Sequence, residues 1–431
     1  MEKAVFRRIG CTVYEGRTEV GLDYMILPSP GSQRQVFAIV VGKGGAPDEE
    51  SIDGTRIPLG TAHFLEHRLF QLEEGDAEEQ FAALGCYCNA VTSTTSTTYY
   101  FSVGKGGEWE KGLELLARMC TTFFMSEENV DRERKIILQE RQRSIDDPDY
   151  IMFDQLLHAL YFHAPIREDI IGTPESLEAI HTSALRKFFR RHYTPGNMVL
   201  FALGDLDPVE VAAKIEKLKL YNGFAALDAV KAKLPEEDRT RVREKEVVLP
   251  SPDGQTYLGV GIKFPTRESL YNRFGDLLFA MYEILPQAVF SPILKPLDEA
   301  RQKGLLIRLD GVDIQQAGED ACLIATFETN APNKLRAALD KHLDNVYSSL
   351  SLFGRELKAI RLDYLGSASL TVQDPEALLS EVVSGYENHV AWPALASRAC
   401  TAGANDVLSL LKELSQWPRS YVTLTGARKG E

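Results

Sequence analysis

Long apolar runs are missing from this chain. A helix that spans a membrane needs about 18 or more consecutive apolar residues, and no apolar run in the sequence approaches that length. The first eight residues, Met-Glu-Lys-Ala-Val-Phe-Arg-Arg, also lack the apolar core and the small-residue cleavage site of a signal peptide. We therefore expect a protein that does not enter a membrane and that is located in the cytoplasm.

Cysteine and net positive charge are also scarce. Of the six cysteines only Cys86 and Cys88 are close together, and one intervening residue is not the spacing of a zinc ribbon or a redox motif. The thiols are predicted to be free and mostly buried, as in a reducing compartment. The formal net charge of −14 argues against a nucleic-acid partner, whose phosphates would be repelled, and is compatible with cationic peptides.

The rest of the composition is that of a folded protein with two domains. The 431 residues exceed one ordinary core, and they are 44% hydrophobic and 26% charged. A charged, irregular segment at 222–245 is predicted to be a linker. Apolar strands predicted at 199–204 and 421–426 both stop at a glycine, which indicates a duplicated unit. We predict an α+β fold with two homologous domains, 1–221 and 246–431, each an antiparallel-rich β-sheet packed against several helices.

One short segment carries candidate metal ligands. Residues 60–70 have the sequence Gly-Thr-Ala-His-Phe-Leu-Glu-His-Arg-Leu-Phe, which contains the inverzincin pattern His-x-x-Glu-His. On a helix, His63 and His67 lie four residues apart on one face, and Glu66 projects from nearly the same face. Two imidazoles on adjacent turns can hold one Zn²⁺, with the carboxylate close to a water on the metal. The same residues can also form a solvated stripe, so this segment alone leaves both interpretations open.

A second helix, predicted at 127–145, carries two further carboxylates. Glu133 and Glu140 are seven residues apart, so they share a face with Val130 and Ile137. A carboxylate on a partly apolar face needs a partner because an unpaired buried charge is unfavourable, and a zinc ion or a histidine bound to one is such a partner. The alternative is an exposed helix whose carboxylates pair with its own arginines.

With both helices in view, residues 20–215 resemble the pitrilysin/insulinase family of inverzincin zinc peptidases, which includes the mitochondrial processing peptidases. The matching motifs, in chain order, are Gly-Thr-Ala-His-Phe-Leu-Glu-His at 60–67, Leu-Gly-Cys-Tyr-Cys-Asn-Ala-Val-Thr at 84–92, Glu-Arg-Lys-Ile-Ile-Leu-Gln-Glu at 133–140, Gly-Thr-Pro-Glu-Ser at 172–176, Tyr-Thr-Pro-Gly-Asn-Met-Val-Leu at 193–200 and Gly-Asp-Leu-Asp-Pro at 204–208. Several ordered motifs are far more specific than one pentapeptide. The contexts Glu-His-Arg-Leu-Phe and Asp-Asp-Pro-Asp are most similar to the bacterial branch associated with elongation-factor-P modification.

The resemblance implies a role for each residue of the motif. His63, His67 and Glu140 would bind one zinc ion per chain, and Glu66 would be the catalytic base. Glu133 would support the site without binding the metal. Three protein ligands leave a fourth position for a water whose pKa zinc lowers to about 7, and the base can pass its proton to the leaving amine.

The resemblance also implies where a substrate binds. Asn89 and Ala90 would lie on an edge strand to which a peptide adds as a further strand. Active members commonly supply an Arg and a Tyr from the second half to hold the substrate and the oxyanion. Arg301 is the candidate for the Arg, and no Tyr follows it before Tyr347. The alternative for Arg301 is an ordinary surface position on a helix.

The second half offers no metal site of its own, since its histidines, His342 and His389, are not near other candidate ligands. The leading hypothesis is a zinc endopeptidase that hydrolyses peptides or small unfolded proteins. Family members of this length supply half of a closed chamber, so a homodimer or a heterodimer with a paralogous subunit is implied. The alternative, favoured by the missing Tyr, is a zinc-binding but non-proteolytic subunit that binds a peptide.

Overall fold

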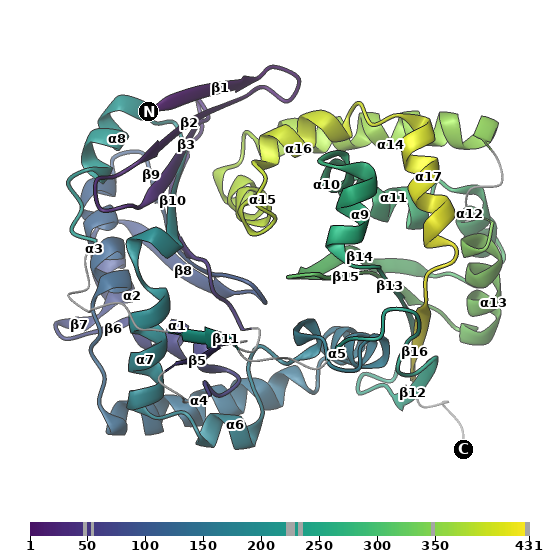
Figure 1. Ribbon diagram of the computed structural model, residues 1–431, viewed down its shortest axis with the longest axis horizontal. Coiled ribbons are helices and arrows are strands. Elements are labelled where there is room, and N and C mark those ends of the chain that lie inside the picture. The colour runs from purple at the N-terminus through teal and green to yellow at the C-terminus, as the bar shows by residue number, and fades with distance from the viewer. Residues whose placement is uncertain (46–49, 53–55, 221–228, 232–235, 346–349, 427–431) are drawn as a thin grey trace. The chain divides into compact units, whose positions relative to one another are not determined.

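The computed structural model describes residues 1–45, 50–52, 56–220, 229–231, 236–345 and 350–426, which form two compact units (Figure 1). Each unit combines segments from both halves of the chain. Unit 1 contains Met1–Gln139, Glu168–Lys233 and Gly366–Ser397, and unit 2 contains Glu140–Arg167, Leu234–Leu365 and Arg398–Glu431. Of the linker predicted at 222–245, residues 222–228 and 232–235 lie outside the described part of the chain. The predicted domain boundaries stay a prediction.

A seven-stranded mixed sheet is the centre of unit 1. In spatial order its strands are β1 (Glu2–Phe6), β2 (Cys11–Arg17), β3 (Asp23–Pro28), β10 (Met198–Gly204), β4 (Arg34–Val41), β9 (Thr97–Gly104) and β8 (Cys86–Thr92). β10 runs parallel to β3 and antiparallel to β4. Every residue of β10 is buried, as is typical of a central strand. β8 lies at the edge of the sheet, pairs with β9 and alternates between buried and exposed residues.

The helices of unit 1 come from distant parts of the sequence. They are α1 (Thr61–Leu69), α2 (Ala77–Ala83), α3 (Trp109–Thr121), the first part of α4 (Glu127–Ser144), α6 (Pro174–Glu178), α7 (Thr182–His192), α8 (Pro208–Ile215) and α15 (Pro375–Glu387). α1 packs against α7, β8 and β9, whereas α15 packs against β4 and β10. A helix from the second half of the chain therefore completes the core of the first unit.

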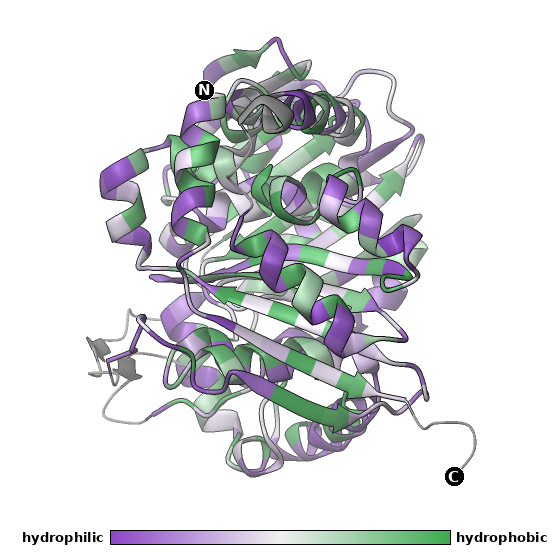
Figure 2. Ribbon diagram, turned by 90° about the vertical axis from the view of Figure 1, so that its right-hand side faces the viewer, coloured by the Kyte–Doolittle hydropathy of each residue, from purple (hydrophilic) through white to green (hydrophobic). Residues whose placement is uncertain are grey.

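Unit 2 is built on a five-stranded sheet. In spatial order its strands are β12 (Glu246–Pro250), β16 (Arg419–Thr425), β13 (Tyr257–Lys263), β15 (Asp320–Glu328) and β14 (Arg308–Ala317). Its helices include α5 (Pro148–Leu160), α9 (Arg267–Phe274), α10 (Leu277–Tyr282), α11 (Leu285–Phe290), α12 (Lys295–Gln302), α13 (Pro332–Leu343), most of α14 (Leu350–Thr371) and α17 (Ala404–Leu414). Hydrophobic positions run along the strands of this unit, as Figure 2 shows, and α5 from the first half packs on β13 and β16.

The two sheets share one topology, which confirms the predicted α+β fold with two homologous domains. The order β3-β10-β4-β9-β8 in unit 1 corresponds strand by strand to β12-β16-β13-β15-β14 in unit 2. In both sheets the first pair is parallel and the remaining pairs are antiparallel. The two glycine-terminated strands that indicated the duplication, β10 and β16, occupy equivalent positions.

Candidate metal centre

The His-x-x-Glu-His segment forms the helix α1, whose position is set by a glycine. Gly60 precedes the helix with φ of 83°, a left-handed conformation that glycine adopts readily. A β-carbon at this position would lie 2.4 Å from the carbonyl oxygen of Ile171, so no other residue fits without displacing the backbone. Phe64, Leu65 and Leu69 are buried and fix the orientation of the helix in the core. The start and the rotation of α1 are thereby determined.

The three predicted metal ligands come together. One ligand atom from each of His63, His67 and Glu140 lies within 4.8 Å of the others. His63 and His67 are successive residues on one face of α1, with ring centroids 4.7 Å apart, and Glu140 is on α4. Two imidazoles and one carboxylate are a donor set that catalytic zinc sites use. The residues therefore fit a zinc ion. In the described part of the chain they are the one group of three His, Cys, Asp or Glu side chains close enough to hold a metal.

Glu133 connects the two helices of the site. Its Oε1 lies 3.1 Å from Nδ1 of His67, and its Oε2 accepts a hydrogen bond of 3.1 Å from Nη1 of Arg68. Burial alone would raise the pKa of Glu133, but the hydrogen bonds from His67 and Arg68, together with the charge of Arg68, lower it overall. An ionised carboxylate can only accept, so in the neutral imidazole Nδ1 of His67 carries the proton and Nε2 has the lone pair that a metal needs.

The predicted alternative, a fully solvated α4 helix, does not describe its central turns. Val130, Glu133 and Ile137 are buried, and Arg134 is buried as well. Nε and Nη2 of Arg134 donate to the carbonyl oxygens of Leu177 and Ile180, at 3.0 and 2.7 Å. These contacts attach α4 to the chain around α6 and fix the face that carries the carboxylates.

Glu66 is buried beside the two histidines and has a partner on the edge strand. The hydroxyl of Thr92, the last residue of β8, donates a hydrogen bond of 2.5 Å to Oε2 of Glu66. The hydroxyls of the buried Tyr99 and Tyr193 are 2.6 Å apart, and burial raises the pKa of both phenols, so both stay neutral. A carboxylate held in this way presents one oxygen at a fixed position next to the candidate metal ligands.

The predicted substrate-binding residues lie on the sheet edge. Asn89 and Ala90 are in β8, which pairs with β9 on one side and ends the sheet on the other. Oδ1 of Asn89 accepts a hydrogen bond of 2.8 Å from the backbone N–H of Ala90. Tyr87, Asn89 and Val91 are exposed, while Ala90 is buried. An edge strand of this kind can accept a further strand. The role of these residues in substrate binding stays a prediction.

Arg301 lies in unit 2, and the closely spaced Cys86 and Cys88 lie in β8. Arg301 is in the last turn of α12, is 61% exposed and bonds Oδ1 of Asp298 three residues earlier at 2.8 Å. Its predicted contact with substrate stays a prediction. All six cysteines are free thiols and five are buried, as predicted. Burial raises the pKa of Cys86 to about 11 and that of Cys88 to about 12, so neither is a reactive thiolate.

Two residues of the site were missed by the sequence analysis. Arg68 follows the second histidine, but its partner Glu133 is 65 residues away. Thr92 belongs to one of the matched motifs, and its hydroxyl reaches Glu66 because Ala90 and Thr92 point to the same face of β8. The alternation of the strand was a usable signal for Thr92, whereas nothing local marked Arg68 as a buried partner.

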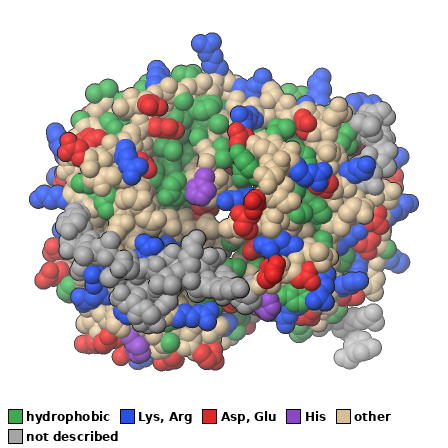
Figure 3. Space-filling model, in the orientation of Figure 1, with side chains coloured by type: hydrophobic (Ala, Val, Ile, Leu, Met, Phe, Trp, Pro, Cys, Tyr) green, Lys and Arg blue, Asp and Glu red, His purple; other side chains and the backbone are tan. Residues whose placement is uncertain are grey.

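Neither the surface charge on one face of the molecule nor the hydropathy of the described helices indicates a further binding site. Acidic and basic side chains are interspersed on the face shown in Figure 3, although the sequence has a net charge of −14. No helix among the described residues combines the length and apolar character that crossing a membrane requires.

Two sequence profiles match this chain. The profile described as "Insulinase (Peptidase family M16)" matches residues 29–174, which include α1 and α4. The profile described as "Peptidase M16 inactive domain" matches residues 180–282.

Individual relatives agree with these profiles. "Uncharacterized zinc protease YmfH" of Bacillus subtilis is 30% identical over 260 residues, which are 59% of this chain and 60% of that protein. The "Probable mitochondrial-processing peptidase subunit beta" of Arabidopsis thaliana is 31% identical over 163 residues, which are 37% of this chain and 30% of that protein. The matches thus span less than two thirds of the length of these relatives.

Solved structures extend the likeness to nearly the whole chain. A crystal structure described as an M16-like peptidase from Alicyclobacillus acidocaldarius superposes with a TM-score of 0.86 and 25% identity, covering 97% of this chain and 99% of the other. A protease from Helicobacter pylori superposes with a TM-score of 0.78 and 17% identity, covering 95% and 99%, which concerns the fold alone.

Proposed function

The chain belongs to the insulinase family of zinc peptidases, and on this premise we propose that it is a zinc-dependent endopeptidase that hydrolyses peptides or small unfolded proteins. The observation that carries the proposal is the convergence of His63, His67 and Glu140, with Glu66 buried beside them. A binding site for a structural metal needs a fourth protein ligand, whereas three ligands with an adjacent carboxylate are typical of hydrolytic zinc sites.

Each residue of the site has a task in this proposal. His63, His67 and Glu140 would hold one zinc ion, which when bound would supply a Lewis acid and acidify a water molecule. Glu66 takes the proton from the attacking water and delivers it to the nitrogen of the leaving amine. Thr92 holds one oxygen of Glu66, which leaves the other to face the reacting atoms. Glu133 orients the imidazole of His67 and keeps its proton on Nδ1.

The substrate would bind as an additional strand. The backbone of β8 has sheet partners on one side, and a peptide in extended conformation can pair with the other side. Such pairing is made by main-chain groups and therefore tolerates many sequences, which suits an enzyme that acts on unfolded polypeptides. Asn89 and Ala90 lie in this strand, a few residues from Thr92.

We further propose that the active form is a dimer, either of two identical chains or with a paralogous subunit. The Arabidopsis relative is named as a subunit of a processing peptidase, which supports a heterodimer as one possibility. The exposed position of Arg301 supports the need for a second chain or for a conformational change, since among the described residues its side chain makes no hydrogen bond or ion pair beyond its own helix. Light scattering of the purified chain would distinguish a homodimer from a monomer awaiting its partner.

The alternative function is a zinc-binding subunit that binds peptides without cleaving them. The absence of a tyrosine between Arg301 and Tyr347 favours it, and the retention of Glu66 opposes it, because a binding protein has no need of a base. The test is hydrolysis of a mixed library of unstructured peptides by the wild-type chain and by Glu66→Gln. Cleavage by the wild type alone, at equal zinc content, supports the peptidase. Peptide binding without cleavage by either protein supports the alternative.

A further inference from the structure

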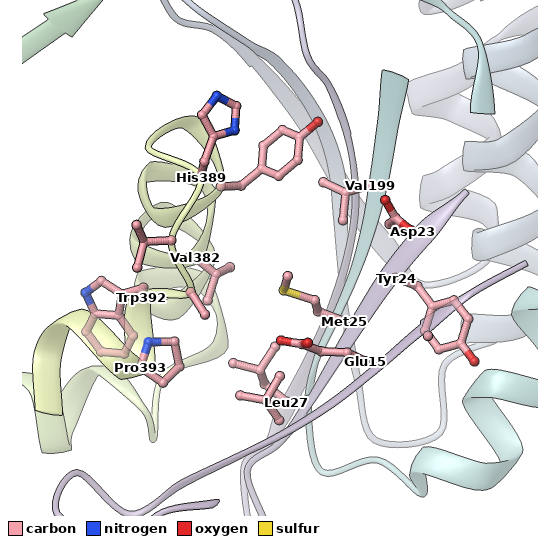
Figure 4. Close-up of a pocket in the computed structure, with 15 residues that line it drawn as sticks. Glu15, Asp23, Tyr24, Met25, Leu27, Val199, Val382, His389, Trp392 and Pro393 are labelled. Atoms are coloured by element: carbon pink, nitrogen blue, oxygen red, sulfur yellow. The ribbon is translucent and has the colours of Figure 1, made fainter. Parts of the chain in front are cut away.

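A cavity of about 470 Å³ opens on the sheet of unit 1 near β2 and β3 (Figure 4). Its floor is one face of three adjacent strands, because alternate residues of a strand point the same way. β2 supplies Val13 and Glu15, β3 supplies Asp23, Met25 and Leu27, and β10 supplies Val199. The opposite wall comes from α15 and the segment that follows it, through Val382, Tyr386 and residues 389–393.

The cavity exists because a helix covers part of a wider sheet. α15 packs on the central strands β4 and β10, whereas β3 and β2 continue the sheet beyond it. The chain then turns at His389 and enters α16 (Trp392–Ala399), which begins with Trp392 and Pro393, so the turn closes one side of the space. A volume of this size is within the range of small-molecule sites in proteins.

The turn that closes the cavity contains an unusual backbone conformation. His389 has φ of 58° and is the one non-glycine residue with positive φ in the described part of the chain. The N–H of His389 donates to the carbonyl of Tyr386, and that of Val390 donates to the carbonyl of Gly385, both at 2.9 Å. This is the helix-terminating motif in which glycine is the usual residue at the His389 position. A histidine placed there, at the edge of a cavity, accepts backbone strain and supplies a polar side chain.

The charges that line the cavity have one sign. Among its lining residues Glu15 and Asp23 are acidic, and none is lysine or arginine. Figure 4 shows the Glu15 carboxylate directed from β2 toward the wall that Val382 and Trp392 form. Within the described residues Glu15 has no ion-pair partner, whereas Asp23 lies 3.6 Å from Arg17 in a pair that is mostly exposed. The remaining surface is mainly apolar.

We propose that this cavity binds an amphipathic organic cation, with its apolar body between the strand floor and α15 and its ammonium group beside Glu15. Val13, Leu27 and Val382 are buried apolar residues that an alkyl chain would contact. The carboxylate of Glu15 would neutralise the charge at the partly exposed end of the site. This site goes beyond the peptidase proposal, since none of its residues belongs to the metal centre.

The test compares three ligands that share one alkyl chain: octylammonium, octanol and octanoate. Calorimetric titration of the full chain at pH 7 and low ionic strength measures each affinity. We expect octylammonium to bind roughly two- to five-fold more tightly than octanol, as one partly exposed ion pair allows, and octanoate to bind most weakly. Equal affinities, or tighter binding of octanoate, would overturn the proposal, and so would the absence of binding by octylammonium.

Two variants locate the binding. Glu15→Gln is expected to bind octylammonium and octanol with equal affinity. Glu19→Gln, at an exposed position that does not line the cavity, should keep the wild-type preference for octylammonium. Met25→Phe adds volume to the floor and is expected to weaken all three ligands. Retained ammonium preference in Glu15→Gln would contradict the assignment, and retained binding in Met25→Phe would place the ligand elsewhere.

Discussion

His67 and Glu133 are 66 residues apart in the sequence, and the Nδ1 atom of the histidine lies 3.1 Å from Oε1 of the glutamate. The same carboxylate binds the guanidinium of Arg68, which is 5% exposed. One buried group thus joins α1 to α4 and fixes which nitrogen of His67 has its lone pair available. The metal centre depends on this arrangement although Glu133 is not one of the three converging ligands.

Glu133→Gln is predicted to weaken zinc binding by roughly ten- to hundred-fold, since partners that orient a metal-binding histidine commonly have effects of this size. The glutamine side chain has one accepting oxygen in place of two, so either Arg68 or His67 loses its hydrogen-bond acceptor. Competition with a chromophoric chelator measures the affinity. Glu128→Gln, at an exposed position on the same helix, is the control and should retain wild-type affinity. Equal affinities in both variants would show that Glu133 does not support the site.

Thr92→Val is predicted to lower kcat roughly ten- to hundred-fold with little change in zinc affinity, because it removes a hydrogen bond to a charged group. Thr92→Ser keeps the hydroxyl and should restore most of the activity. Steady-state peptide hydrolysis and zinc titration of both variants provide the comparison. Loss of zinc from Thr92→Val would instead indicate a structural role for the strand end.

The fold was largely predictable because its signals are local. Runs such as Met198–Gly204 are apolar throughout, which is typical of a central strand, and the alternation in Cys86–Thr92 indicates an edge strand. It was not predictable that α5, from the first half of the chain, belongs to unit 2, or that α15, from the second half, belongs to unit 1. A helical pattern shows that one face is buried, but it does not show which sheet that face contacts.

The site was predictable to the extent that its residues repeat on one helix. Helical spacing places His63, Glu66 and His67 on one face, whereas their roles were assigned only through the family resemblance. The assignment of Glu140 relied on the family resemblance, and the structure now places its carboxylate near both histidines. Arg68 could not be assigned from the residues, because the burial of its guanidinium depends on a partner in a different helix.

A buried ion pair in unit 2 leads to a stability prediction. Lys263 is fully buried, and its ammonium group donates to Glu237 and to the carbonyl of Leu160. Glu237→Gln leaves a buried positive charge uncompensated and is predicted to lower the free energy of unfolding by about 3–5 kcal/mol. Urea denaturation measures the change, and Glu236→Gln, at an exposed neighbouring position, is the control. If both variants unfold at the wild-type urea concentration, the pair does not stabilise the unit.

His342 leads to a prediction about pH. Burial lowers its pKa, and although the bond between its Nε2 and the carbonyl of Val289 (2.7 Å) opposes this, the net shift is downward. The unfolded chain therefore binds a proton near pH 6.5 while the folded chain does not, so stability falls as the pH drops below 6.5 toward the native pKa. The loss is at most about 1.4 kcal/mol per pH unit.

His342→Gln removes the titrating group but retains a donor for the Val289 carbonyl. Urea midpoints between pH 7.5 and 5.5 should fall less for this variant than for the wild type. His181→Gln, at an exposed position, should follow the wild-type curve. Parallel curves for all three proteins would mean that His342 does not contribute to the acid sensitivity.

The central claim, a zinc ion held by His63, His67 and Glu140, is tested most directly by metal analysis of the purified chain after extensive dialysis. We predict one zinc per chain in the wild type and in Glu66→Gln, and little or none in His63→Gln and in Glu140→Gln under the same conditions. A wild-type chain that retains no zinc, or a Glu140→Gln chain that retains it with undiminished affinity, would contradict the account.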